Sequence, residues 1–421
     1  MKLSKHKLGE LIEVTRGASL SGQFYAEEGE LIRLTLGNFN MNGGGFKENT
    51  SKTDLYYTGT VKDEFILNKG DIITPLTEQS LGLLGTTARI PENGKYIQSQ
   101  DVALVKCKEG LLDPNFCYYL ISSSIVRQQL SAGAQQTKIR HTSPDKIKDC
   151  TVWVPEFEEQ KRIGRILTDI DEKITLNRQI NDNLEAMAKQ LYDYWFVQFD
   201  FPNEEGKPYK SNGGVMVWNE MLKREIPQGW NDCKIKDFMR IFTGKKDVSK
   251  AVPGNYKFFS CAPEPISSNE YIYDGYAVLV SGNGSYTGRV GFYKGKFDLY
   301  QRTYACVLDE DEHNISFFYY TLRYLFQPIY SGGKHGSSIP YIVLGDLADF
   351  RFAFNETICT KFVDAAKPMF DEQLLRQKEI EALTKQRDEL LPLLMNGQAT
   401  VNYHLSVLVS PYYIIYRDQY K

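Results

Sequence analysis

The sequence predicts an α+β protein in which two similar globular domains alternate with two long helices, and the helices pack together as an antiparallel coiled coil. Three observations carry this prediction. Segments 200 residues apart resemble each other, two charged segments have the apolar spacing of long helices, and other segments alternate in the manner of strands. The 421 residues, of which 42% are hydrophobic and 24% charged, suffice for two or three domains with separate cores.

Internal repetition relates the two halves of the chain. KLGELIEVTRGAS, starting at Lys7, resembles KIKDFMRIFTGKKD, starting at Lys234, in its apolar spacing and its Thr/Gly turn. TTARI at Thr86 lies 200 residues before YTGRV at Tyr286. Alternating runs such as DVALVKC and TYACVL predict a mostly antiparallel sheet in each half. The predicted order is therefore domain, helix, domain, helix, a pseudo-twofold internal repeat.

Two segments have the seam of helices that pack side by side. From Ile163 to Leu191 and from Ala366 to Leu394, seam positions recur in alternating steps of three and four. Two amphipathic helices, each packed only on its own domain, are the alternative, but their length and matched positions favour pairing with each other. Polar seam residues weaken packing and fix register. Those near the middles of the seams are Lys173, Asn177, Gln373 and Arg376.

The first helix runs into an aromatic segment, WFVQFDFP, which starts at Trp195. We expect these aromatic residues to form an apolar cap at the end of the helix, and Pro202 to stop the helix. Gly397 is the expected stop of the second helix. The predicted division is 1–155 first globular domain, 156–200 first spacer helix, 201–228 linker, 229–355 second globular domain, 356–397 second spacer helix, and 398–421 a tail without an assigned role.

Bulk composition excludes some classes of protein and leaves others open. No apolar run reaches the roughly 18 residues of a membrane span, and the N-terminal segment lacks the apolar run of a signal peptide. The seven cysteines are scattered without a CxxC spacing, which predicts a reducing compartment and a cytoplasmic protein. The net charge of −3 does not favour nucleic acid, but DNA responds to local basic stripes rather than to net charge.

The sequence lacks the motifs of a catalytic or cofactor site. GNGSYTG (282–288) and NGGGF (42–46) do not open a helix in a βαβ unit, and no GxxxxGK[ST] motif occurs, so both are predicted to be turns. The nearest match to the [ND]PP[YF] tetrad of adenine methyltransferases is SPYY at Ser410, with a single proline. No two histidines are three or four residues apart. We therefore expect no catalytic residue, no metal and no cofactor.

Four motifs, taken in order, resemble the type I restriction-modification specificity subunits. They are EQKRIGRILTDIDEKI in the first helix, WFVQFDFP at its end, IPQGW before the second domain, and LPLLMNG at the end of the second helix. The resemblance covers nearly the whole chain, from Lys7 to Val401, and the order is more specific than any single motif. After Val401 the chain adds NYHLSVLVSPYYIIYRDQYK, which the family pattern does not explain.

The resemblance implies a DNA-recognition subunit without catalytic activity of its own. In that family the globular domains are target recognition domains, each of which recognises one half of a split site in double-stranded DNA. The helices are the regions that space these domains and bind two modification subunits, which are methyltransferases. Restriction subunits, with translocase and nuclease activity, join through the modification complex. No membrane partner is implied.

Glycine-containing loops in matched places are the best candidates for DNA contact. GAQQTKIRH (133–141) and GGKHGSSIP (332–340) combine a flexible backbone with hydrogen-bonding and cationic side chains, which suit phosphates and base edges. A solvated surface loop is the alternative, and the recurrence of the loop in both halves favours DNA. The predicted contact residues are Gln135, Gln136, Thr137, Lys138, Arg140, His141, Lys334, His335, Ser337 and Ser338.

Matched cations form a second predicted set. Arg16, Lys245 and Lys246 lie on the repeated Thr/Gly turn, while Arg89 and Arg289 are 200 residues apart. Contact with backbone phosphates and an ordinary solvated charge both remain open for these residues. Aromatic residues such as Tyr56, Tyr57, Tyr286 and Tyr341 could approach bases, but they are not assigned to DNA, because most of the 27 tyrosines are expected to pack inside the protein.

Two alternative functions remain from other classes of protein. One is a stand-alone adenine DNA methyltransferase with a related recognition domain, which would bind S-adenosylmethionine by itself. The other is a coiled-coil scaffold that binds protein, which would lack salt-sensitive retention on duplex DNA.

Overall fold

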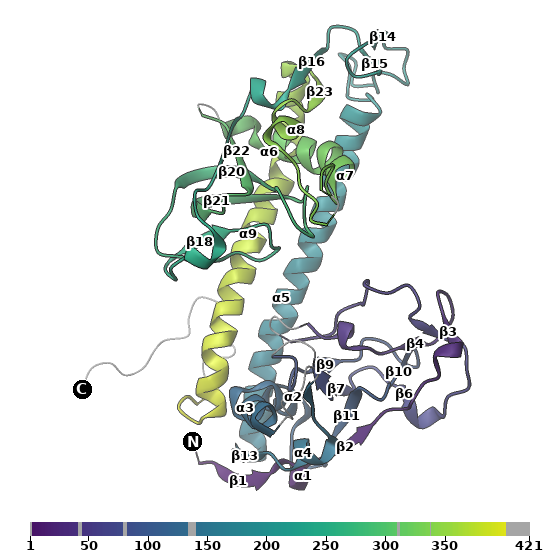
Figure 1. The fold of residues 1–421 in the computed structure, drawn as a ribbon, viewed down its shortest axis with the longest axis vertical. Coiled ribbons are helices and arrows are strands. Elements are labelled where there is room, and N and C mark those ends of the chain that lie inside the picture. Colours follow the sequence, from purple (N-terminus) through teal and green to yellow (C-terminus); the bar gives the residue numbers. More distant parts are fainter. Residues whose placement is uncertain are drawn as a thin grey trace, which may run out of the picture. The chain divides into compact units, whose positions relative to one another are not determined.

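A computed structural model describes most of the chain, and its contacts divide it into two units. The first unit is Met1–Leu176 with Glu379–Lys421, and the second is Asn177–Lys378. Each unit therefore contains one globular domain and a portion of each long helix, α5 (Phe157–Tyr192) and α9 (Glu356–Met395) (Figure 1). The described residues are 2–40, 44–78, 82–133, 140–309, 312–336 and 338–400.

The main sheet of the first unit is antiparallel, with the strand order β2-β11-β7-β9. A separate pair, β1 with β13, joins the beginning of the domain to the residues just before α5. The strands are β1 (Ser4–Lys7), β2 (Ile12–Arg16), β7 (Ile72–Pro75), β9 (Ala88–Arg89), β11 (Val102–Cys107) and β13 (Thr151–Val154).

Short helices cover this sheet and bury its apolar residues. Helix α2 begins where Pro114 fixes the first turn and the Asp113 side chain accepts a hydrogen bond from the backbone N–H of Phe116. Its Phe116 and Leu120 are fully buried, in one cluster with Leu8 of α1. The helices are α1 (Leu8–Leu11), α2 (Pro114–Ser122), α3 (Ser124–Gly133) and α4 (Pro144–Lys148).

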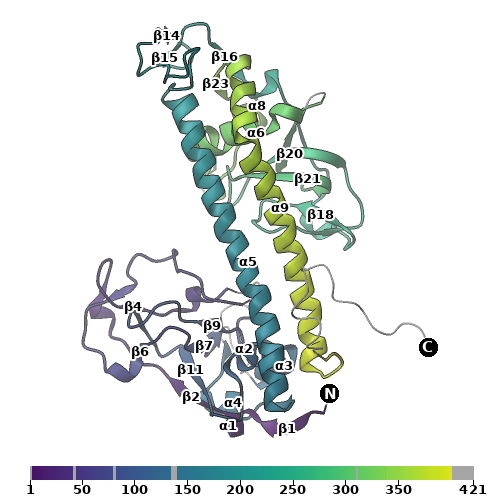
Figure 2. The same ribbon diagram turned by 180° about the vertical axis from the view of Figure 1, so that it is seen from behind.

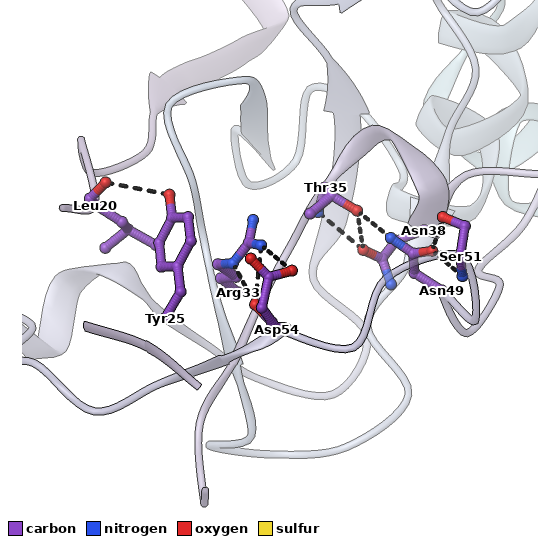
Figure 3. A network of polar contacts seen from close by, with 8 residues as sticks. All are labelled: Leu20, Tyr25, Arg33, Thr35, Asn38, Asn49, Ser51 and Asp54. Atoms are coloured by element: carbon purple, nitrogen blue, oxygen red, sulfur yellow. Dashed lines mark hydrogen bonds and ion pairs between the residues drawn. The ribbon is translucent and has the colours of Figure 1, made fainter. Parts of the chain in front are cut away.

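A second sheet of two-residue strands lies in the same unit, and its Leu67 and Tyr96 share an apolar cluster with Ile73 and Leu104 of the main sheet. Such short strands provide few ladder hydrogen bonds, and side chains supply others (Figure 3). Arg33 donates from Nε and Nη2 to the Asp54 carbonyl oxygen at 3.1 and 2.9 Å, and its guanidinium lies 3.8 Å from the ring centre of Tyr25. The strands are β3 (Tyr25–Ala26), β4 (Ile32–Arg33), β5 (Tyr56–Tyr57), β6 (Ile66–Leu67) and β10 (Tyr96–Ile97).

The main sheet of the second unit repeats the strand order of the first. Its order is β17-β22-β20-β21-β18-β19, in which the first four strands match β2-β11-β7-β9. The pair β16 with β23 likewise matches β1 with β13. The predicted internal repeat is confirmed at this level. The strands are β16 (Asn231–Lys234), β17 (Arg240–Thr243), β18 (Tyr256–Phe259), β19 (Ile266–Ser268), β20 (Tyr273–Ser281), β21 (Val290–Leu299), β22 (Thr303–Val307) and β23 (Arg351–Phe354).

Matched glycines mark the end of the first strand in each sheet. A Cβ on Gly17 would overlap the carbonyl oxygens of Gln98 and Ser99, and a Cβ on Gly244 would overlap that of Leu299. Both glycines therefore allow the turn after the strand to approach the segment before β11 or β22. This close approach explains the Thr/Gly turns of the sequence repeat.

The second unit also contains the short helices α6 (Ile315–Thr321), α7 (Gln327–Tyr330) and α8 (Leu344–Ala348). After α8, Asp349 accepts hydrogen bonds from the ammonium groups of Lys234, at 2.8 Å, and Lys236, at 2.7 Å. These hydrogen bonds lower the pKa of the Asp349 carboxyl to about 2. They connect β16 and the residues after it to the end of α8.

The aromatic segment after α5 differs from the prediction. Trp195 and Phe196 are in the main apolar core of the second unit, with Phe317 and Phe362, rather than in a cap at the helix end. The helix continues as a π-helical turn, Asp193–Val197, and stops before Pro202, where Phe199 takes a left-handed backbone (φ 62°). The 201–228 segment contains a hairpin of β14 (Met216–Asn219) and β15 (Arg224–Pro227).

Within each unit, α5 and α9 pack side by side and run antiparallel (Figure 2). In the first unit, Ile174 packs against Ile380 and Leu383. In the second, Arg376 Nη1 donates to Asn177 Oδ1 at 3.4 Å, and Asn177 is 1% exposed. The predicted helix pairing is confirmed in both units, with a buried polar residue at the seam.

A tyrosine from each globular domain binds a carboxylate on α5. In the first unit, Tyr119 donates to Asp171 at 2.7 Å, and Asp171 also pairs with Arg387 of α9 at 2.8 Å. In the second unit, Tyr319 donates to Glu185 at 3.4 Å, and Glu185 accepts from Gln373 of α9 at 3.1 Å. Each domain is thereby joined to both helices of its own unit.

Among the described residues, no helix has the length and apolarity needed to cross a bilayer. All seven cysteines fall within the described ranges and are free thiols. The C-terminal segment 401–421 lies outside the described residues.

Candidate nucleic-acid interface

Loops of the second unit meet at one edge of its main sheet. Strand β17 ends at Thr243 and β20 at Ser281, while β21 begins at Val290 and β22 at Thr303. Because these strands are antiparallel neighbours, the two ends and the two starts lie at the same edge. The Gly282 N–H donates to the carbonyl oxygen of Arg302 at 3.0 Å, which joins two of these loops.

The predicted glycine loop of the second unit packs on this edge. The Gly284 N–H donates to the Pro340 carbonyl oxygen at 2.9 Å, and the Thr287 hydroxyl donates to the same oxygen at 2.8 Å. The Ile342 N–H donates to the carbonyl oxygen of Gly282 at 2.9 Å. The structure therefore brings the glycine loop next to the segment that carries Arg289.

The first unit has the same arrangement. Strand β12 (Arg140–His141) pairs with β8 (Thr77–Glu78), which follows the end of β7. The Thr142 N–H donates to the Leu76 carbonyl oxygen at 2.8 Å, the counterpart of the bond from Ile342 to Gly282. Arg16, at the end of β2, is at the same edge of the sheet.

Several predicted residues are available to a ligand at these edges. Lys245 is exposed and has no ion-pair or hydrogen-bond partner among the described residues. Arg16 is exposed and uses its Nε to bond the Gln100 carbonyl oxygen at 2.8 Å. His141 and Ser338 are also exposed. Exposed donors of these types suit phosphate oxygens.

Other predicted cations are already engaged within the protein. Lys246 pairs with Glu270 and, at 3.0 Å, with Asp298, which is 1% exposed. Arg289 donates to the carbonyl oxygens of Ala262 and Pro263 at 2.6 and 3.2 Å. Burial lowers the pKa of the Arg289 guanidinium from its usual value. These two side chains hold loops together.

Two predicted cations of the first unit are also engaged by other groups of the protein. Arg89 donates to Asn115 Oδ1 at 2.7 Å and lies 4.9 Å from the ring centre of Tyr118. Arg140 pairs at 3.2 Å with the buried carboxylate of Glu78. That carboxylate also accepts the backbone N–H groups of residues 82–84 at 2.9 to 3.0 Å, so it organises the loop edge.

The second glycine loop has internal contacts as well. His335 Nε2 lies 3.1 Å from Asp346 Oδ2, and its ring stacks on Tyr341 with centroids 5.2 Å apart. Lys334 is exposed, and its ammonium bonds the Tyr330 hydroxyl at 3.2 Å. Five of the predicted residues lie outside the described ranges: Gln135, Gln136, Thr137, Lys138 and Ser337.

The sequence-based prediction missed residues at these edges. Arg302 is exposed in the loop before β22, next to the turn that carries Lys245. Ile339, which the sequence did not single out, is an exposed apolar side chain in the second unit, as are Tyr286 and Tyr341, which were considered but not assigned to DNA. The sequence offered one signal, the position of Arg302 directly before the strand that pairs with β17. Within the described residues, no cluster of three or more His, Cys, Asp or Glu is placed to hold a metal ion.

The chain matches the family model of the type I restriction modification DNA specificity domain over residues 2–186 and 227–354. It belongs to this family. The two matched stretches hold the two loop edges described above, so the role of the chain is DNA recognition in a type I restriction-modification system. A stand-alone adenine methyltransferase is not favoured.

Individual relatives agree with the family. The chain is 25% identical over 324 residues to the type I restriction enzyme MjaIX specificity subunit of Methanocaldococcus jannaschii, with 70% of this chain and 71% of the relative covered. It is 32% identical over 186 residues to the EcoDI specificity subunit of Escherichia coli, covering 43% and 41%. The crystal structure of the S subunit from M. genitalium has the same fold, with a TM-score of 0.59 at 18% identity, covering 94% and 96%.

Proposed function

We propose that the two domains of this specificity subunit recognise the two halves of one bipartite target in double-stranded DNA. The observation that supports this is the recurrence of the same loop edge in both units, where β12 in one and the glycine loop in the other are each followed by a matched backbone hydrogen bond, Thr142 to Leu76 and Ile342 to Gly282. Two similar surfaces in one chain suit two half-sites. No residue of the chain is assigned to catalysis.

The partners in this proposal are two modification subunits, with methyltransferase activity, and restriction subunits that join through them. The paired helices are the proposed docking region. With a net charge of −3, the chain alone offers DNA little long-range attraction. It should therefore bind its target weakly alone and more tightly when modification subunits complete a basic clamp. Equal affinity of the chain alone and the assembled complex at physiological salt would contradict this part.

The predicted DNA-binding residues fall into groups according to whether their side chains are exposed or bonded to other parts of the protein. We assign Arg16, His141, Lys245, Lys334 and Ser338 to direct contact with DNA, because their side chains are exposed. Predicted residues whose side chains bond other parts of the protein are assigned to positioning the loops. Predicted residues outside the described ranges keep their sequence-based assignment to DNA contact. The positioning residues are Arg89, Arg140, Lys246, Arg289 and His335, and the sequence-based contacts are Gln135, Gln136, Thr137, Lys138 and Ser337.

The proposed domains are those expected from the sequence. Recognition domains occupy 1–155 and 229–355, spacer helices 156–200 and 356–397, with a linker at 201–228 and a tail at 398–421. The proposed location is the cytoplasm, because seven free cysteines suit a reducing compartment that also holds the DNA.

Exchange of one domain tests the proposal. Residues 229–354 are replaced by the corresponding segment of a relative, and methylated sites are mapped in cells that carry the modification subunits. One half-site should change while the other stays the same. If both halves changed, or neither did, the two domains would not be independent recognition modules.

A further inference from the structure

Large apolar side chains are exposed at the loop edge of the second unit. Tyr286 is 48% exposed, Ile339 62% and Tyr341 38%. They belong to two loops that are hydrogen-bonded to each other through Gly284 and Pro340. A cluster of exposed apolar side chains in one place indicates a binding surface.

Backbone hydrogen bonds and a glycine shape the described part of the loop that carries Ile339. His335 and Tyr341 exchange backbone hydrogen bonds in both directions, at 3.3 and 3.1 Å. Gly336 has a left-handed backbone (φ 81°), and a Cβ there would overlap the Ile339 carbonyl oxygen, so only glycine fits. These contacts flank Ile339, whose side chain is exposed to solvent.

The first unit has an isoleucine, Ile139, at the sequence position that matches Ile339, outside the described residues. The bonds Thr142 to Leu76 and Ile342 to Gly282 correspond, which makes His141 the counterpart of Tyr341. The residue before His141 is Arg140, which pairs with a buried carboxylate. The two recognition domains therefore differ at the positions next to this isoleucine, where Arg140 and His141 correspond to Pro340 and Tyr341.

Cations beside the apolar cluster favour DNA over a protein partner. Lys334 is in the same loop as Ile339, and exposed Lys245 and Arg302 occupy the same edge of the sheet. Lysine and arginine bind phosphates and thereby place neighbouring side chains against base edges. The apolar group that a base edge offers in the major groove is the 5-methyl group of thymine.

We propose that the second recognition domain identifies a thymine in its half-site through the 5-methyl group, with Ile339 as the contacting side chain. Tyr286 and Tyr341 are the other apolar residues of this surface. This inference rests on the proposed function, since it specifies what one of the two domains recognises.

The test replaces thymine by uracil, one position at a time, in the half-site assigned to the second domain by the domain exchange. Uracil lacks only the methyl group and keeps the hydrogen-bonding edge. The assembled complex with modification subunits is titrated with each duplex at one fixed salt concentration. Loss of one buried methyl group, about 0.8 kcal/mol, should weaken binding about fourfold at one position.

The variant Ile339→Ala shows whether that methyl group is contacted by this side chain. It should weaken binding to the thymine duplex by fourfold or more and should abolish the difference between thymine and uracil at the sensitive position. The matched control is Ile272→Ala, an isoleucine of the same domain that is 45% exposed at the opposite end of β20. The control should keep the full uracil effect.

Three outcomes would overturn the inference. If replacing each thymine of the half-site by uracil left the affinity unchanged, the domain would not contact a thymine methyl group. A uracil effect that persists in Ile339→Ala would assign the contact to another residue. An Ile339→Ala variant with unchanged DNA recognition but impaired assembly with modification subunits would make the apolar surface a protein interface. If the wild-type complex showed no preference for its mapped site, the proposed function would fail as well.

Discussion

The buried ion pair between Arg387 and Asp171 should stabilise the first unit measurably. The Arg387 side chain is 10% exposed and that of Asp171 27% exposed, and the pair joins α9 to α5 at 2.8 Å. The variant Arg387→Met keeps the bulk of the side chain and removes its charge. Asp171 would retain one partner, the hydroxyl of Tyr119, whose pKa is raised by burial, so that it stays protonated.

The expected loss follows from the exposure of the carboxylate. Removing one partner of a fully buried pair costs about 3 to 5 kcal/mol, because an uncompensated charge stays inside the protein. Water reaches Asp171 in part, so we expect about 2 kcal/mol, below that range. The control is Lys385→Met on the same helix, where an ammonium with 77% exposure lies 3.9 Å from Glu389. Such an exposed pair contributes about 0 to 1 kcal/mol.

Hydrogen exchange is the suitable assay, because a chain with two units does not unfold in one step. A loss of about 2 kcal/mol should accelerate exchange of the protected amides of α2 about 30-fold, while those of α6 in the second unit stay unchanged. The double variant Arg387→Met, Asp171→Leu should recover part of the loss, since it leaves no unpaired charge. If Arg387→Met altered α2 no more than Lys385→Met did, this pair would not stabilise the unit.

Other predictions concern the second unit. The folded pKa of the Asp349 carboxyl, about 2, lies below its unfolded value of about 3.9, so its hydrogen bonds stabilise the fold above about pH 4 and are lost as the pH falls toward 2. The variant Asp349→Asn should therefore flatten acid unfolding between these pH values, and an unchanged acid transition would contradict this. The variant Gly244→Ala should lower the free energy of unfolding by about 3 kcal/mol, because the new Cβ overlaps the backbone of Leu299. The control Gly291→Ala, with space around its Cβ, should cost far less, and equal shifts of the melting temperature would refute the close approach at Gly244. The variant Lys245→Ala should weaken binding to all DNA sequences and reduce the slope of log affinity against log salt concentration by about 1. The variant Lys246→Ala should mainly lower thermal stability, and the reverse pattern would exchange the two assignments.

Local patterns of the sequence sufficed to predict the helices and the repeat. Seam positions such as Ile174 and Leu383 recur along one face of a helix, and that periodicity is a property of consecutive residues. The Thr/Gly turns at Gly17 and Gly244 were visible for the same reason, since a turn is determined by a few neighbouring residues. Amphipathic helices, turns and their order along the chain were therefore accessible without coordinates.

Only the tertiary structure decided where the aromatic segment packs and which cations are available. Trp195 lies in a domain core because its partners, among them Phe362, come from a distant part of the chain. Lys245 and Lys246 are neighbours in sequence, yet one is exposed and the other is neutralised by Asp298, 52 residues away. A residue's charge follows from its type, but whether that charge is exposed depends on which distant carboxylate the fold places beside it.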